Sequence, residues 1–296
     1  MNSKARIQPA IFLLLGATTF WGLNFHLAKI ILRDVHFIEA GFWRYLFGVA
    51  FLLFLVLRNK RWLPWSAIWA ESKGLLLVGV VGLFGFNLLF FLGLQHTSAL
   101  NAALIVALNP VTTLLFSHWM LGSPIEGRQQ VGMSIALLGV LLLLTKGQPL
   151  QVFEIEWSKG DWLILAANLV FALQNVWVKK YAGRIHNLSF TFLTNLLCLL
   201  GFVVVLPIMG LETPPISNQA FWLAVLGIGI LGTSLAYLFW NRGIQLLGAA
   251  NAGLFMNAVP LMAALFALVF GERLHLYHAY SGALILLGLY YVQRKK

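Results

Sequence analysis

Long apolar runs separated by short polar connections dominate the pattern of this 296-residue chain. Ten runs come close to the ~20 residues that a helix needs to cross a bilayer. They cover residues 9–32, 38–57, 74–94, 98–120, 127–145, 160–180, 188–209, 219–241, 249–270 and 274–293. Most connections are very short, so neighbouring helices must run antiparallel. The pattern predicts an all-α integral membrane protein with ten transmembrane helices.

The same apolar pattern occurs twice. Residues 99–116 align without a gap to residues 249–266, and seven of the eighteen positions are identical. A chain this rich in alanine and leucine would give about two identities by chance. Each copy carries one proline near the middle, Pro110 or Pro260. The sequence therefore predicts an internal duplication, with an irregular point in each copy of this helix.

The duplication divides the chain into two repeats of five helices. The first repeat covers residues 1–146, a connecting loop covers residues 147–159, and the second repeat covers residues 160–296. Because five is an odd number, the second repeat must enter the membrane upside down relative to the first. Such inverted repeats build many alternating-access transporters. One chain holds both halves of the cavity, so we expect it to act as a monomer.

The net charge of +11 is consistent with nucleic-acid binding only if the basic residues gather on one surface or tail. Here they lie in short loops between apolar runs, which is what membrane topology predicts. With a cytoplasmic N-terminus, the inside segments hold 14 Lys and Arg and the outside segments hold five. We therefore expect both termini in the cytoplasm and no nucleic-acid partner.

Polar residues inside the apolar runs are the candidates for a binding site, because lipid supplies them with no partner. The best placed are Asn24, Asn87, Asn101, Asn175, Asn195, Tyr237 and Asn251. Phe90 lies three residues after Asn87, and Trp240 lies three residues after Tyr237 at the equivalent place in the second repeat. Two such polar and aromatic walls suit a ligand with an apolar body and polar ends. The alternative is that each asparagine only joins neighbouring helices.

Pro110 and Pro260 each remove one helical hydrogen bond, so each is either a hinge or a static kink. Arg44 is the clearest charge within a predicted span; it either attracts a substrate carboxylate, reaches toward the interface or pairs internally. All carboxylates fall near helix ends. We therefore expect facilitated or exchange transport rather than tight proton coupling.

The residue inventory argues against an enzyme. The only two aspartates, Asp34 and Asp161, are far apart, and no histidine has an aspartate five residues later. The single cysteine and the scattered histidines lack metal-ligand spacing, and no phosphate-binding loop is present. We expect no cofactor and no metal.

Several segments in order resemble EamA-type transporters of the drug/metabolite transporter superfamily. These are Trp21-Gly22-Leu23-Asn24-Phe25 with Lys29, Arg44-Tyr45-Leu46, Thr97-Ser98-Ala99 through Pro110, Leu138-Gly139-Val140, and Gly271-Glu272-Arg273-Leu274. The resemblance covers nearly the whole chain as two units. It implies ten helices in an inverted repeat, located in a bacterial inner membrane, around a central cavity that exports metabolites.

The branch of the family that the chain most resembles exports amino acids, including aromatic ones. On this reading, Asn24, Asn101, Asn175 and Asn251 orient the polar ends of the substrate, and Phe90, Tyr237 and Trp240 meet its side chain. Membrane lipids surround the protein. The alternatives are an exporter of drugs or other small metabolites, and a lipid-handling membrane protein that transports no solute.

Overall fold

The computed structural model describes residues 4–61, 65–97, 99–154, 157–209, 217–271 and 275–293. Within these residues the regular secondary structure is entirely helical, with no strand. In this described part of the chain, nine helices are long and apolar enough to cross a membrane, and a shorter apolar helix, Leu276–Val292, stands at the place of the tenth expected span. The fold class is thus confirmed as helical and membrane-spanning, while the number of ten spans stays a prediction.

The first half of the chain contains α1 (Lys4–Ile31), α2 (Phe37–Arg58), α3 (Trp65–Ala70), α4 (Ser72–Leu76), η1 (Leu77–Gly85), α5 (Phe86–Leu94), α6 (Ala99–Val106), α7 (Asn109–Leu121), α8 (Gly127–Leu144) and η2 (Pro149–Glu154). The second half contains α9 (Lys159–Tyr181), η3 (Ala182–Arg184), α10 (Asn187–Met209), α11 (Gln219–Gly227), η4 (Ile228–Leu235), α12 (Ala236–Leu247), α13 (Ala249–Gly253), η5 (Leu254–Asn257), α14 (Ala258–Val269) and α15 (Leu276–Gln293).

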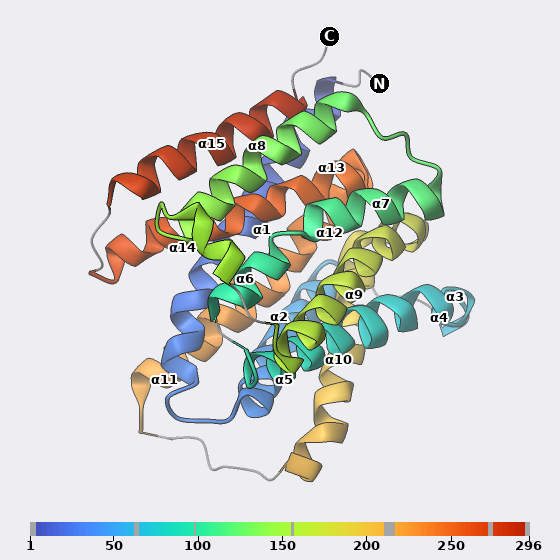
Figure 1. The fold of residues 1–296 in the computed structure, drawn as a ribbon. Coiled ribbons are helices and arrows are strands. Elements are labelled where there is room, and N and C mark those ends of the chain that lie inside the picture. Colours follow the sequence, from blue (N-terminus) through green and yellow to red (C-terminus); the bar gives the residue numbers. More distant parts are fainter. Residues whose placement is uncertain are drawn as a thin grey trace.

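Equivalent helices of the two halves use equivalent neighbours. Helix α1 packs against α12 and α14, and its counterpart α9 packs against α5 and α7. Helix α2 packs against η4, and its counterpart α10 packs against η1. Each half therefore places its first two helices against the other half. The two halves are interleaved rather than side by side (Figure 1).

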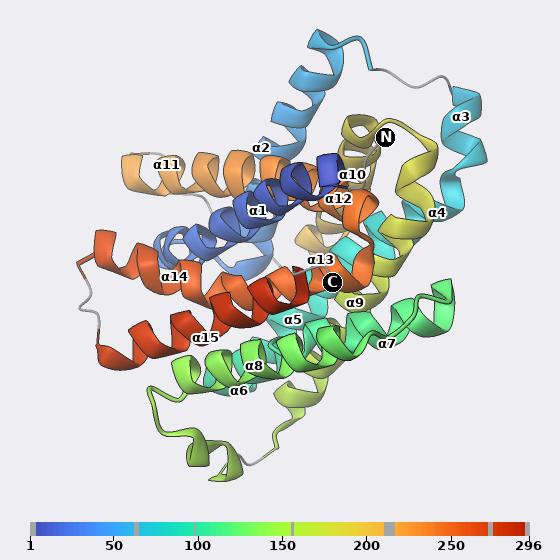
Figure 2. The ribbon, with the colours of Figure 1, turned by 90° about the horizontal axis from the view of Figure 1, so that it is seen from above.

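Helices α8 and α15 lie side by side along their length in both views (Figure 1, Figure 2). Glycines allow this close approach. A Cβ atom added at Gly132 would lie 2.7 Å from the backbone oxygen of Gly288, and one added at Gly139 would lie 2.8 Å from that of Ser281. Small residues of this kind are the usual means by which membrane helices pack closely. Glycine therefore permits the close packing of these two helices.

The third helix of each half contains a π-helical segment, η1 or η4, that the hydropathy pattern did not predict. These segments are glycine-rich, and glycine weakens the regular helix because it adds backbone freedom. In η4 the hydroxyls of Thr233 and Ser234 hydrogen-bond to carbonyls five residues earlier, at 3.0 and 3.1 Å. Gly79 in η1 contacts α10, whereas Gly229 in η4 contacts α2.

The two proline helices are interrupted, as the sequence predicts. Residues 107 and 108 separate α6 from α7, and Pro110 lies in the first turn of α7, where proline is tolerated. In the second half, the short 3₁₀ segment η5 joins α13 to α14, which contains Pro260. Each irregular point lies just before the proline because the ring obstructs the preceding turn.

Candidate functional site

A buried aromatic group lies where α1, α9 and α12 meet. We call Trp21, Phe171, Asn175, Tyr237 and Trp240 the central cluster. The ring of Trp21 lies 5.0 Å from that of Trp240, 5.5 Å from that of Tyr237 and 6.2 Å from that of Phe171, measured between centroids. Apart from Trp21, on α1, its members come from the second half of the chain. The structure thus brings Asn175, Tyr237 and Trp240 together, as the sequence analysis expected of a site.

Hydrogen bonds connect the central cluster to α7. The indole Nε1 of Trp240 donates to Oδ1 of Asn175 at 2.9 Å, and neither side chain has any exposed surface. Nδ2 of Asn175 in turn lies 3.3 Å from the hydroxyl of Thr113 and 3.5 Å from Oδ1 of Asn109. Asn109 also donates to Oδ1 of Asn168 at 2.9 Å. Buried amides in apolar surroundings need such partners, and they link three helices here.

A second polar group lies between α2, α5 and η4. Nδ2 of Asn87 donates to the hydroxyl of Tyr45 at 3.1 Å, and Nε of Arg44 donates to the hydroxyl of Thr233 at 2.7 Å. Tyr237 interacts with both Tyr45 and Arg44, which joins this group to the central cluster. Arg44 therefore pairs internally, which is one of the roles that the sequence left open.

Asn24 approaches η4 at a glycine. Its Nδ2 lies 3.4 Å from the backbone oxygen of Gly232, which also accepts a hydrogen bond of 3.1 Å from the indole of Trp21. A Cβ atom at position 232 would collide with the Asn24 side chain. Oδ1 of Asn24 is buried and has no hydrogen-bond partner among the described residues. An unpaired buried acceptor is unfavourable, so it marks a place where a ligand or water would be stabilised.

The structure places the other three predicted contact residues elsewhere. Asn101 hydrogen-bonds to Asp161 at the start of α9. Asn251 accepts a hydrogen bond of 2.9 Å from Gln129 in the first turn of α8. These are opposite ends of the bundle, because α8 spans it before the chain turns back into α9. Phe90 packs in a small apolar cluster with Ile164. The ring of Phe86, 5.6 Å from that of Phe90 and 4.9 Å from that of Phe171, separates it from the central cluster.

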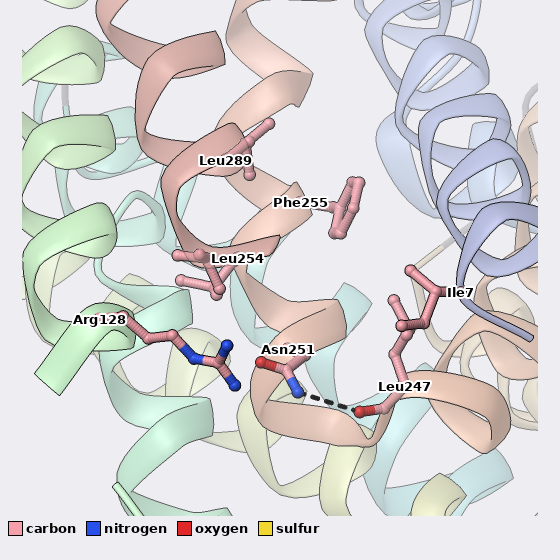
Figure 3. A pocket seen from close by; sticks show the side chains of 8 residues that line it. Ile7, Arg128, Leu247, Asn251, Leu254, Phe255 and Leu289 are labelled. Carbon is pink, nitrogen blue, oxygen red and sulfur yellow. Dashed lines mark hydrogen bonds between the residues drawn. The ribbon is translucent and has the colours of Figure 1, made fainter. Parts of the chain in front are cut away.

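Asn251 lines a cavity of about 150 Å³ close to the start of α1. Figure 3 shows its side chain between the guanidinium of Arg128 and Ile7, with Leu254, Phe255 and Leu289 above them. Nδ2 of Asn251 donates to the backbone oxygen of Leu247 at 3.2 Å. This cavity is small for an organic solute, since ligand pockets are usually ~300–1,000 Å³.

A larger cavity of about 640 Å³ lies between α1, α2, α10 and α12, and we call it the basic chamber. Its walls are largely apolar. Its polar lining consists of Asn59, Arg61, His186, Asn187, Arg242 and Gln245. These residues do not stand out in the sequence, because they lie at helix ends and in connections where polar residues are ordinary. Neither this cavity nor the Asn251 cavity is lined by Trp240, so the central cluster is packed shut in this conformation.

Comparison with known proteins identifies the family. The model of the EamA-like transporter family matches residues 8–145 and again residues 158–294. In the Gly271-Glu272-Arg273-Leu274 motif, residues 272–274 lie outside the described residues. Ser98, in the motif that starts at Thr97, also lies outside them. Most of the motif residues are described, and Trp21, Asn24 and Arg44 take part in the buried contacts above.

Named relatives are transporters. An uncharacterized transporter of Bacillus subtilis, YyaM, is 29% identical over 281 residues, which covers 94% of this chain and 91% of the relative. An S-adenosylmethionine/S-adenosylhomocysteine transporter of Chlamydia trachomatis is 27% identical over 276 residues, which covers 90% and 82%. A protein of known crystal structure superimposes with a TM-score of 0.81 at 21% identity, over 96% of this chain and 97% of the other, and this supports the fold alone. The chain belongs to the EamA-like transporter family and is a multi-pass membrane transporter.

Proposed function

We propose that this transporter exports neutral amino acids, aromatic ones foremost, from the cytoplasm of a bacterium by alternating access. The observation that carries the proposal is the central cluster, whose four aromatic residues lie near amides on α1, α5 and α9. Aromatic rings suit an apolar side chain, and amides suit the ammonium and carboxylate groups. Asn24 offers an unpaired acceptor for an ammonium group.

The repeats would be inverted in the membrane. Three observations support this: the two separate family matches, the exchanged helix pairings, and the equivalent π-helical segments. The start of α1 and the end of α15 lie toward the same side of the bundle as α3 (Figure 1, Figure 2). That side carries most of the Lys and Arg residues, so both termini would be cytoplasmic and the protein would sit in the inner membrane.

Transport requires the central cluster to open. Trp240 and Asn175 fill the centre in this conformation, so a substrate enters only if α12 and α9 separate. The interrupted helices at Pro110 and Pro260 would supply the hinges, because the broken backbone there bends at little cost. Asn101 and Asn251 would then act at the two ends of the path, and Asn24, Asn87, Asn175, Tyr237 and Trp240 at its centre.

A second candidate substrate is S-adenosylmethionine. A relative carries it in its name, and the molecule combines an amino-acid group with an aromatic base. The central cluster would stack the base in the place of an aromatic side chain. Both candidates share the α-amino carboxylate, so the same amides serve either one.

Counterflow in proteoliposomes tests the proposal. Vesicles containing the full chain are loaded with one unlabelled solute, and entry of labelled phenylalanine, threonine, S-adenosylmethionine or a cationic dye is followed separately. Entry of phenylalanine that depends on an aromatic amino acid inside supports the first candidate, and entry of S-adenosylmethionine alone supports the second. Movement of the dye alone supports a drug exporter, and no solute movement in folded protein supports a lipid-handling role.

Alanine at Asn24 or Asn175 should lower the counterflow rate at least tenfold, whereas alanine at Gln130 should leave it within twofold. Gln130 is an exposed amide on α8 that lines neither cavity. Full activity of the Asn24 and Asn175 variants in well-folded protein would contradict the assignment of the central cluster.

A further inference from the structure

The basic chamber is an open cavity whose walls come from several helices. Its apolar walls come from four long helices and include Leu13, Leu55, Leu188 and Leu238. Its volume of about 640 Å³ falls in the range of small-molecule sites. Phe239 also lines the chamber, and its ring lies 6.0 Å from that of Phe20, the residue before Trp21. Phe239 thus places the chamber next to Phe20, whose neighbour in the chain, Trp21, belongs to the central cluster.

Three basic groups converge on the chamber. Arg61, His186 and Arg242 all line it, and none of the described residues that line it is Asp or Glu. Partial burial and the charges of Arg61 and Arg242 lower the pKa of His186, so both guanidiniums lie close to the imidazole. Arg242 also donates to Oε1 of Gln245 at 3.1 Å. Neither arginine forms an ion pair with a described residue, so their positive charge is left for a ligand.

The internal repeat shows that this pair of arginines occurs in one half only. At an offset of 150 residues, His186 corresponds to His36, but Arg242 corresponds to Leu92 and Arg61 to Leu211. Asn187 likewise corresponds to Phe37, which is buried and packs its ring 5.3 Å from that of Phe91. The equivalent positions in the sequence therefore lack both arginines, although Arg33 stands at the position of Gly183. The preference for basic residues in cytoplasmic loops explains on which side of the membrane Arg61 and Arg242 lie. It does not explain why both line one cavity.

We propose that the basic chamber binds the carboxylate of an organic solute and is the point at which the solute enters from the cytoplasmic side. Arg61 and Arg242 hold the carboxylate, because charged hydrogen bonds from guanidinium to carboxylate are strong and directional. The leucine walls and Phe239 hold the apolar part of the solute against the central cluster. This inference rests on the proposed transport function but concerns a separate site.

The test measures binding rather than transport. The full chain is placed in nanodiscs of an uncharged phosphatidylcholine, and binding of labelled 3-phenylpropionate is measured by equilibrium dialysis. This probe carries the carboxylate and the ring but lacks the ammonium group. We expect saturable binding that weakens as salt is added and falls at least tenfold in the R61Q/R242Q variant. The R61K/R242K variant, which keeps the charge, should lose less.

The matched control is R58Q/K60Q, which removes two positive charges at the same end of α2 from exposed residues that do not line the chamber. It should bind the probe within twofold of the unaltered chain. Equal binding by R61Q/R242Q, or displacement of the probe by phenethylamine as readily as by unlabelled probe, would overturn the proposal. If R61Q/R242Q does not fold, the salt dependence of probe binding and the phenethylamine competition, both measured on the unaltered chain, still test the proposal.

The phosphate of a lipid headgroup is a second kind of anion that would bind the same two arginines. Adding phosphatidylglycerol to the nanodiscs should leave probe binding within twofold, and strong competition by this lipid would refute a solute site. Failure of the proposed function is separate: counterflow would be absent for every solute while arginine-dependent probe binding persists. If counterflow is active but probe binding does not depend on either arginine, this inference is wrong and the proposed function is unaffected.

Discussion

The hydrogen bond between Trp240 and Asn175 should join α12 to α9 energetically. The Trp240→Phe change removes the indole N–H that donates to Oδ1 of Asn175 at 2.9 Å. Asn175→Ala removes the acceptor instead. Both side chains are completely buried, so water cannot replace the lost partner in either variant. Each single change should therefore destabilise the protein by about 1–3 kcal/mol, the usual cost of an unpaired buried polar group.

The coupling energy between Trp240 and Asn175 is more informative than the loss of stability in either single variant. Once one partner is gone, removing the other no longer breaks the bond between them, so the double variant should lose less than the sum of the single losses. Hydrogen bonds between membrane helices contribute about 0.6 kcal/mol on average and up to about 1.7 kcal/mol. The short distance and complete burial place this bond in the upper part of that range. We expect a coupling energy of about 1–1.7 kcal/mol.

The assay is unfolding of the full chain in mixed micelles by added dodecyl sulfate, followed by far-ultraviolet circular dichroism. The control cycle replaces Trp240→Phe with Trp177→Phe. Trp177 lies two residues from Asn175 on α9, and residues two apart on a helix do not face each other. The control cycle should be additive within about 0.5 kcal/mol. Additivity of Trp240→Phe with Asn175→Ala would refute the link between these helices.

Three further outcomes follow from the packing. Gly132→Ala should push α8 from α15 and lower the free energy of unfolding by about 1–3 kcal/mol. Gly127→Ala is the control: an added Cβ there meets nothing within 4 Å, so it should be neutral or stabilising in the same unfolding assay. Pro260→Ala restores a helical hydrogen bond, so the melting temperature should hold or rise while counterflow slows several-fold; unchanged counterflow would remove the hinge. The pKa of His186 is lowered by partial burial and the two chamber arginines, so the unfolded chain binds its proton more readily and stability should fall as pH drops below ~6.5. His186→Gln should lessen this loss between pH 7 and pH 5, and an identical loss would contradict the assignment.

A separate prediction is that transport is not tightly coupled to protons. Among the described carboxylates, Glu39 and Asp161 are buried, but both lie in the first turn of a helix, as the sequence indicated. Neither lies beside the central cluster. We therefore expect counterflow without net accumulation when only a pH gradient is imposed. Uphill accumulation of phenylalanine that follows the imposed gradient would contradict facilitated or exchange transport.

The sequence by itself determined the membrane class, the duplication and the interrupted helices. These follow from local properties: apolar length sets the spans, proline removes a hydrogen bond wherever it stands, and a repeat needs only an alignment. The same local reasoning selected Asn175, Tyr237 and Trp240, because amides and aromatic residues in apolar helices need partners. Their meeting in one cluster supports the choice of residues, while substrate contact there is still a proposal.

Only the tertiary structure decided which amides meet. Asn101 and Asn251 occupy equivalent positions in the repeat, yet they bond Asp161 at one end of the bundle and Gln129 at the other. Sequence reasoning placed both at the centre because an offset of 150 residues carries no information about depth. The basic chamber was missed for a related reason. Arg61 and Arg242 lie 181 residues apart at the ends of different helices, and it is the packing of the two halves around each other that turns their charges toward one cavity.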